Sequence, residues 1–507
     1  MNELFPIKNG AALPLAELAP LPFERFAAAI AANLKTDSEI IACFAHRPVG
    51  NDRNEVFAIL GQPTSHELQI LRGELPARYP SLTLRWPQFH LFEREMAEQF
   101  GVVPEGHPWL KPVRFHRVWH GERDVWGRDL EQHPLVGDME YYQVEGDEIH
   151  EVGVGPVHAG IIEPGHFRFQ CLGEKVLHLE ISLGYQHRGA ERLFIGGPHP
   201  QTPYQMETLA GDTTIGHMTA YCQVLEALAG IEAPPRARGI RTIALELERL
   251  ANHVGDIGAL AGDVGFLPTA SFCGRLRGDY LNMTAAICGS RFGRGLVRPG
   301  GVLFDTDHDL ALRLLTDLAT TNKHTDGALR LFFHTPSVLS RLEGTGRVRS
   351  EDARQLGLTG VAGRACDLDT DCRRLYPTAH GTAKETPLQT TAEDGDVSAR
   401  ARIRRHEIDH AISVIREQLP NLPAGPLRAD LGTLRPGLLA VSLVEGWRGR
   451  IAHVALTDGQ GKLARYKVID PSFFNWSGLA MALRNEQISD FPLCNKSFNL
   501  SYCGFDL

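Results

Sequence analysis

A continuous apolar seam between residues 240 and 257 is the feature that most constrains the fold of this chain. Its members recur at steps of three or four positions: Ile240, Ile243, Leu247, Leu250, Val254 and Ile257. This period places them on one face of an α-helix, and such a seam is typical of helices that pack in a bundle. We therefore expect a long core helix here, inside a mainly helical domain.

A second helix is expected just before this one. Thr213 can cap its N-terminus, and its apolar face ends at Gly230, which is a common residue after a helix C-terminus. That face is formed by Tyr221, Val224, Leu225 and Leu228.

The first part of the chain mixes helical and strand patterns. An amphipathic helix is expected over residues 23–34, with strands over 55–60 and 80–85. Residues 90–100 predict another helix, which ends at Gly101. These elements predict an α+β fold for the N-terminal part.

Composition excludes several classes of function. The 507 residues have a formal net charge of −9, so no basic field supports binding to nucleic acid. No apolar run approaches the roughly 18 residues of a membrane span, and the N-terminus lacks the pattern of a signal peptide. We expect a cytoplasmic protein, or one peripheral to the cytosolic face of a membrane.

The nine cysteines are scattered, and none forms a C-x-x-C pair. This spacing offers no zinc, iron–sulfur or redox-dithiol signature, and each cysteine is expected to be a small buried apolar residue. No phosphate-binding glycine motif for a dinucleotide or nucleotide is present either, so NADH, if it is involved, binds to another chain.

Ordered strings along the chain resemble two related families. Residues 93–101 and 106–108 are similar to the signature of the C-type subunit of complex I, although Glu98 replaces an aspartate and Lys111-Pro112 replaces an arginine pair. From residue 148 onward, several strings resemble the large subunit of membrane-bound (group 4) nickel–iron hydrogenases of the formate-hydrogenlyase type and its relative, the D-type subunit of complex I. These strings are 153–169, 183–192, 298–302, 371–377, 395–400, 445–449 and 471–476.

The resemblance implies a domain organisation. We expect an α/β domain similar to the complex I C-type subunit over residues 1–120 and a linker over 121–147. A mainly α-helical domain with small β-sheets, similar to the D-type subunit, is expected over 148–507. A second polar stretch, 379–397, is expected to be an exposed loop.

The same resemblance locates a metal site whose ligands are missing. In the hydrogenases, four cysteines in two motifs hold nickel and iron, and here these positions fall on Ala210, Thr213, Ser501 and Gly504. Methyl, hydroxyl and hydrogen groups cannot replace thiolates at a soft metal site. Cys494 and Cys503 are out of register, and no C-terminal tail of the kind removed during nickel insertion follows Gly504.

Four polar residues are candidates around the former metal cavity: Glu163, His166, Asp212 and His217. Glu163 matches a glutamate that passes protons in hydrogenases, and His217 matches the retained histidine of the first motif. The alternatives are a solvated surface turn for Glu163 and His166 and a hydrogen-bonded core histidine for His217. The histidine and tyrosine that meet quinone in complex I are absent, because Glu163-Pro164 and Gly211 stand at their positions.

The resemblance implies a subunit of a membrane-associated, complex I-like or formate-hydrogenlyase-like oxidoreductase complex that is not active alone. One expectation is electron transfer to a quinone or another acceptor, coupled to ion translocation, with the Ni–Fe site lost. The alternative is a non-catalytic structural or coupling subunit, and an active hydrogenase is the third possibility. Expected partners are an iron–sulfur small subunit resembling the B-type subunit of complex I, which would carry the cluster, and antiporter-like membrane subunits. The polar residues beside the 240–257 seam could face the iron–sulfur partner: Glu246, Glu248, Arg249, Asn252 and His253.

Overall fold

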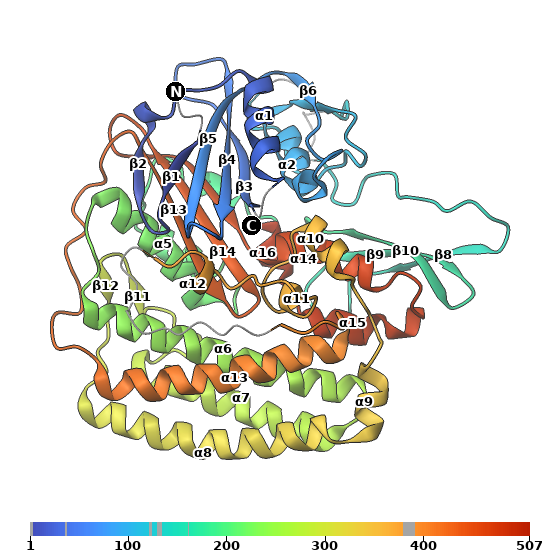
Figure 1. Ribbon diagram of the computed structural model, residues 1–507, viewed down its shortest axis with the longest axis vertical. Coiled ribbons are helices and arrows are strands. Elements are labelled where there is room, and N and C mark those ends of the chain that lie inside the picture. Colours follow the sequence, from blue (N-terminus) through green and yellow to red (C-terminus); the bar gives the residue numbers. More distant parts are fainter. Residues whose placement is uncertain (1–3, 36–37, 121–123, 129–133, 161, 379–390) are drawn as a thin grey trace.

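The computed structural model describes residues 4–35, 38–120, 124–128, 134–160, 162–378 and 391–507. The fold is α+β, as predicted. Figure 1 shows the N-terminal sheet at one end, a second sheet in the middle and long helices in layers at the other end.

The N-terminal part is an antiparallel sheet with two helices. Strand order is β1-β5-β4-β3, with bounds β1 (Phe5–Ile7), β3 (Glu39–His46), β4 (Asn54–Gln62) and β5 (Glu67–Leu75). The helices α1 (Phe23–Asn33) and α2 (His90–Phe100) contact this sheet, and α2 ends at Gly101 in the left-handed conformation. The predicted helices and the strand at 55–60 are confirmed.

The predicted strand over residues 80–85 is wrong. Strand β6 (Arg78–Pro80), which pairs with β7 (Val103–Glu105), ends at Pro80, where the predicted strand should begin. The buried Glu93 carboxylate accepts hydrogen bonds from the backbone N–H groups of Leu82 and Thr83 at 2.8 and 3.0 Å. These groups are therefore used by a side chain and not by a neighbouring strand.

The central sheet joins the two ends of the chain. Its order is β15-β14-β13-β2, with bounds β2 (Ala12–Pro14), β13 (Leu438–Gly446), β14 (Gly449–Thr457) and β15 (Leu463–Ile469). Because β2 pairs with β13, residues before position 15 form an edge of the C-terminal sheet. The other strands are β8 (Ile149–Val154), β9 (His166–Leu172) and β10 (Lys175–Ser182), which form a third sheet, and the short pair β11 (Val297–Arg298) and β12 (Gly301–Val302).

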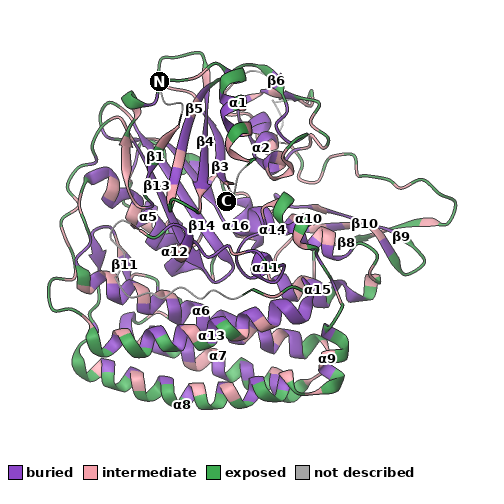
Figure 2. Ribbon diagram, in the orientation of Figure 1, coloured by how far each residue is buried: buried purple, intermediate pink, exposed green. Residues whose placement is uncertain are grey.

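The predicted seam lies on α6 (Pro235–Asp263), and all six of its apolar residues are buried. This helix packs against α5 (Thr214–Ala229), α7 (Leu267–Cys288) and α13 (Val397–Gln418), and α8 (His308–Phe333) covers α7. Figure 2 shows α6 buried along most of its length and α8 exposed on its outer side. The short helices are α3 (Ala190–Leu193), α4 (Thr202–Met206), α9 (Pro336–Leu342), α10 (Ser350–Leu356), α11 (Gly360–Arg364), α12 (Cys372–Leu375), α14 (Ser472–Ala482), α15 (Phe491–Phe498) and α16 (Tyr502–Asp506).

The polar residues beside the seam are buried inside this chain, so the suggestion that they face a partner is wrong. Arg249 contacts Glu246 and Glu407 at 3.0 and 3.1 Å, and His253 contacts the same Glu407 at 2.8 Å. Buried charges require such partners, which α6 finds on α13.

For the predicted loop at 379–397, residues 379–390 lie outside the described residues. Residues 391, 393 and 394 are exposed, as predicted, whereas residues 395–397 are buried at the start of α13.

Candidate functional site

The two segments that carry the four positions matched to the metal ligands of hydrogenases lie side by side. Ala210 and Thr213 precede α5, and Ser501 and Gly504 begin α16. The guanidinium of Arg188 bridges the segments, since it donates to the carbonyls of Leu209 and Cys503 at 3.0 and 3.2 Å.

Thr213 does not cap α5 with its side chain, in contrast to the prediction. Its hydroxyl accepts a 3.1 Å hydrogen bond from Trp447 Nε1 and contacts Asp212 instead. The free N–H groups at the start of α5 donate to the Glu248 carboxylate, from Ile215 at 2.7 Å and from Gly216 at 3.2 Å. The polar string on α6 therefore caps the neighbouring helix.

The space that a side chain at position 504 would need is filled. A Cβ atom added to Gly504 would lie 2.8 Å from Asp470 Cγ and 2.8 Å from Ser501 Oγ. Ser501 Oγ is itself engaged as the N-cap of α16, where it accepts from Gly504 N at 2.9 Å. A carboxylate thus stands where a thiolate side chain of residue 504 would project.

Asp470 begins a buried row of hydrogen-bonding side chains. His217 Nε2 is 3.1 Å from Asp470 Oδ2, His217 Nδ1 is 3.1 Å from His453 Nε2, and His453 Nδ1 is 2.8 Å from the Tyr466 hydroxyl. All four residues are buried. This row comes from α5 (His217), β14 (His453), β15 (Tyr466) and the residue after β15 (Asp470).

The row has one consistent proton arrangement when Asp470 is ionised and both histidines are neutral. The carboxylate can only accept, so His217 carries its proton on Nε2 and accepts at Nδ1. His453 must then donate from Nε2 and accept from Tyr466 at Nδ1. Burial, followed by the neighbouring His217, holds the pKa of His453 well below its ordinary value, which keeps that ring neutral.

The pKa of Asp470 agrees with an ionised carboxyl. Burial acts to raise this pKa, but the hydrogen bond from His217 and the nearby charge of Arg448 hold it below its ordinary value.

Asp212 forms a two-bond ion pair with Arg448. The distances are 2.7 Å from Arg448 Nη1 to Asp212 Oδ1 and 2.8 Å from Nη2 to Oδ2. The guanidinium lies over the Trp447 ring, 3.9 Å from its centroid. Burial acts to raise the pKa of Asp212, yet Arg448 outweighs it and the pKa is lowered. Asp212 is therefore an ionised group that is already neutralised.

Glu163 lies at the outer side of the site and His166 does not join it. Half-buried Glu163 lies near the Cys503 thiol, which contacts Ser501 Oγ at 3.5 Å, and burial together with the charge of Glu163 raises the pKa of that thiol to about 11. His166 instead contacts the Gly155 carbonyl at 3.1 Å and the Tyr141 ring. Of the four predicted candidates, the structure brings Glu163, Asp212 and His217 to the site.

The sequence did not single out Asp470, His453 or Tyr466. They sit in or next to β14, which is fully buried, and β15, which is almost fully buried, so the pattern of the strands does not distinguish a site from the core. Arg448 lies in the family string 445–449, but nothing in that string marks its side chain as part of a site. Over the described ranges, no three His, Cys, Asp or Glu side chains are grouped as metal ligands.

Comparison with known proteins places the chain among two groups of subunits. Residues 263–437 match the family described as "Respiratory-chain NADH dehydrogenase, 49 Kd subunit", and residues 22–143 match "Respiratory-chain NADH dehydrogenase, 30 Kd subunit".

Formate hydrogenlyase subunit 5 of Escherichia coli K12 is 30% identical, with 84% of this chain and 76% of that protein covered. The carbon monoxide-induced hydrogenase of Rhodospirillum rubrum is 31% identical over 69% of this chain and 96% of its own length. The chain belongs to the group 4 hydrogenase-like large-subunit family, in its fused C/D form.

The chain is also similar to a C/D subunit of NADH-quinone oxidoreductase. The one from Gluconacetobacter diazotrophicus is 27% identical, with 83% of this chain and 78% of that protein covered. Among the helices that the structure describes, none is both long and apolar enough to cross a membrane. The domain boundaries at 120 and 147 stay a prediction, although the 30 Kd match ends at 143.

Proposed function

We propose that this chain is a subunit of a membrane-associated, complex I-like or formate-hydrogenlyase-like oxidoreductase complex in which the Ni–Fe site has been replaced by a site for a small electron acceptor. A quinone is the class of acceptor we favour. The observation that carries this proposal is Asp470, which occupies the space next to Gly504 and leaves no room for a fourth thiolate. The site has exchanged soft metal ligands for proton-bearing groups.

The polar groups of the site are suited to binding a quinone and releasing a quinol. Arg448 and the Cys503 thiol are hydrogen-bond donors for a carbonyl, and Glu163 and Asp470 are acceptors for a hydroxyl. Reduction takes two electrons and two protons. We propose that the electrons come from an iron–sulfur cluster in a partner protein, and that protons pass through half-buried Glu163.

A structural or coupling role is the second candidate. The observation that favours it is that Asp212 and Arg448 satisfy one another, as do Asp470 and His217, without any ligand. In this alternative the chain transmits a redox or binding event to ion movement but holds no acceptor. An active hydrogenase is the third candidate.

We propose that the partners are an iron–sulfur small subunit similar to the B-type subunit of complex I and antiporter-like membrane subunits. The complex would lie on the cytosolic face of the inner or plasma membrane. The names of the relatives support an assembly of this kind, since one is a subunit of formate hydrogenlyase and another a subunit of NADH-quinone oxidoreductase.

The test is purification of the native complex through a tag on this chain, followed by nickel analysis and quinone titration of its iron–sulfur clusters. Glu163→Gln should lower quinone reduction at least about tenfold, because it removes a proton-transferring group. Glu151→Gln is the matched control, since Glu151 contacts Arg168 and Gln170 on the β8–β9 hairpin.

Equal turnover in wild type and Glu163→Gln would favour the structural alternative. Nickel in near-stoichiometric amount would support a hydrogenase and overturn the proposal. Recovery of the chain alone would exclude the complex.

A further inference from the structure

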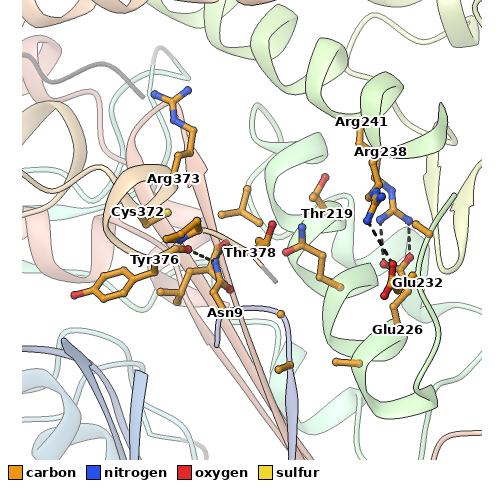
Figure 3. Close-up of a pocket in the computed structure, with 18 of the residues that line it drawn as sticks. Asn9, Thr219, Glu226, Glu232, Arg238, Arg241, Cys372, Arg373, Tyr376 and Thr378 are labelled. Atoms are coloured by element: carbon orange, nitrogen blue, oxygen red, sulfur yellow. Dashed lines mark hydrogen bonds and ion pairs between the residues drawn. The ribbon is translucent and has the colours of Figure 1, made fainter. Parts of the chain in front are cut away.

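A cavity of about 440 Å³ lies away from the former metal site, at the junction of the two ends of the chain. Its walls come from residues 9–12, from β13, from α5 and the first turns of α6, and from α12 with the residues that follow. Figure 3 shows Asn9, Tyr376 and Thr378 on one side and Thr219, Glu226 and Arg241 on the other. The volume is that of a small-molecule site.

The wall formed by the N-terminal segment is fixed in place. The Asn9 amide donates to the carbonyls of Tyr376 and Leu443 at 2.9 and 3.0 Å, and its oxygen accepts from Leu443 N at 2.7 Å. All of these atoms are buried. The cavity is therefore pre-formed, and a ligand would not have to order this wall.

The charged groups of the lining are already neutralised. Glu226 accepts two hydrogen bonds from Arg241, at 2.6 and 3.1 Å. Arg238 pairs with Glu232 at 3.6 Å, and Arg373 pairs with Asp371 at 2.7 Å. An ionic ligand would find no free counter-charge in the described lining, because each charge of the wall has its own partner.

The groups that remain are hydrogen-bond donors. The Thr219 hydroxyl, on a residue that is 6% exposed, has no partner among the residues the structure describes, and neither does Arg238 Nε. Gln223, which also lines the cavity, uses its carbonyl oxygen to accept from Ser442 at 2.6 Å, so its amide nitrogen is the part of the side chain that can donate to a ligand. Buried unpaired donors are costly, so their presence in a lined cavity indicates an acceptor that satisfies them.

We propose that this cavity binds a neutral small molecule that carries at least two carbonyl or ether oxygens. Thr219 and Gln223 lie one helical turn apart on α5 and bind one oxygen, while Arg238 at the start of α6 binds another. Apolar wall residues contact the carbon skeleton: Ala11, Ala12, Ala227, Ile231, Leu245 and Val444. This site is separate from the acceptor site and does not depend on it.

The test is equilibrium dialysis of the full-length chain with duroquinone, a neutral molecule with two carbonyl oxygens and no ring C–H for a thiol to attack. Durene, which has the same methylated ring without oxygen atoms, is the matched probe. We expect duroquinone to occupy this cavity at one molecule per chain, in addition to any molecule held at the proposed acceptor site, and durene to bind the cavity at least about tenfold more weakly.

Two variants distinguish the effect of a hydrogen bond to the ligand from the effect of the cavity volume. Thr219→Val keeps the shape and should weaken duroquinone binding by about five- to twentyfold, which is the effect of one hydrogen bond. Ala227→Phe should remove one bound molecule per chain by filling the cavity. Thr320→Val is the control, because Thr320 lies on the exposed side of α8 and bonds only within that helix.

Equal binding of durene and duroquinone, or unchanged binding in both Thr219→Val and Ala227→Phe, would overturn the proposal. Binding that is undiminished in Ala227→Phe and lost in Glu163→Gln would place the bound molecule at the former metal site alone. That result would reject this cavity site while supporting the proposed acceptor site.

Discussion

Asp470 determines the direction of the hydrogen bonds in the buried row. Its Oδ1 accepts from Ser472 N at 2.8 Å, so an asparagine at this position must present its amide N–H group to His217. Both histidines would then change tautomer, with His217 Nδ1 donating to His453 Nε2 and His453 Nδ1 donating to Tyr466.

We predict that Asp470→Asn reverses both tautomers and lowers the free energy of unfolding by about 1–3 kcal/mol. Nitrogen-15 NMR of a histidine-labelled chain distinguishes the tautomers. Asp212→Asn, which changes a carboxylate outside the row, should leave both rings unaltered. An unchanged ring spectrum in Asp470→Asn would show that Asp470 does not order the row.

Gly504 and Gly211 make a matched pair within the same site. An added Cβ at Gly504 meets Asp470 and Ser501 at 2.8 Å, whereas one at Gly211 has no atom within 4 Å. We predict that Gly504→Ala lowers the free energy of unfolding by about 1–3 kcal/mol through overpacking and that Gly211→Ala changes it by less than about 0.5 kcal/mol. Urea unfolding measures both. An equal effect of the two variants would contradict the filled space next to residue 504.

The sequence predicted the motif positions of this site but not the side chain that fills the space between them. The family strings located positions 210, 213, 501 and 504, because ligand motifs are local in sequence. They did not reveal that Asp470 fills the space, since Asp470 and Gly504 meet only through the packing of α16 beneath the end of β15.

The same limit applies to the prediction of helices and strands. The seam of α6 was readable because six residues repeat with one period, and the structure confirms it. The incorrect strand prediction at 80–85 came from an alternating pattern in which the backbone N–H groups of Leu82 and Thr83 donate to the Glu93 side chain. A side chain that competes for backbone donors leaves no periodic trace.

At the scale of elements, α2 and β15 meet through a buried ion cluster. Lys467 Nζ on β15 contacts Glu95 of α2 at 2.6 Å and Glu191 of α3 at 2.9 Å, and Arg465 contacts the same Glu191 at 2.9 Å. All of these side chains are almost fully buried.

We predict that Lys467→Met costs about 3–5 kcal/mol of unfolding free energy, because it leaves two buried carboxylates with fewer cations. The exposed pair Arg78–Glu105 is the control, and Arg78→Met should cost less than about 1 kcal/mol. Thermal and urea unfolding report both values. A similar small loss in both variants would mean that the buried cluster contributes no more than a surface pair.

His107 gives the turn after β7 a dependence on pH. Its Nδ1 accepts from Trp109 N at 3.0 Å, so the neutral ring donates from Nε2 to the His90 carbonyl at 3.2 Å. Burial, followed by Arg94, lowers the pKa of His107 to about 4. The unfolded chain therefore binds more protons between pH 4 and the ordinary histidine pKa near 6.5.

Because the pKa is lowered on folding, the contribution of His107 to stability is complete above about pH 6.5 and is lost as pH falls towards 4. We predict that wild type loses about 3 kcal/mol more than His107→Gln between pH 7 and pH 4. Denaturant midpoints at a series of pH values check this difference. Parallel pH curves for the two proteins would show that His107 titrates equally in the folded and unfolded chain.

At the scale of the whole molecule, the two family segments are joined by more than a linker. Strand β2 from the first residues completes the C-terminal sheet, Asn9 is bonded across to Leu443, and the Lys467 cluster binds α2 to β15. Each of these contacts crosses the predicted boundary at residues 121–147, and the side chains of Asn9 and Lys467 are buried.

We therefore predict that the two segments unfold in one cooperative transition, although their sequences match two separate families. Hydrogen exchange in increasing urea should give the same dependence for β3–β4 in the N-terminal sheet and for α6 in the helical core. Lys467→Met should lower both together. Earlier opening of β3–β4 alone would instead make residues 1–120 an independent folding unit, and the buried contacts would then hold together two parts that are each stable without the other.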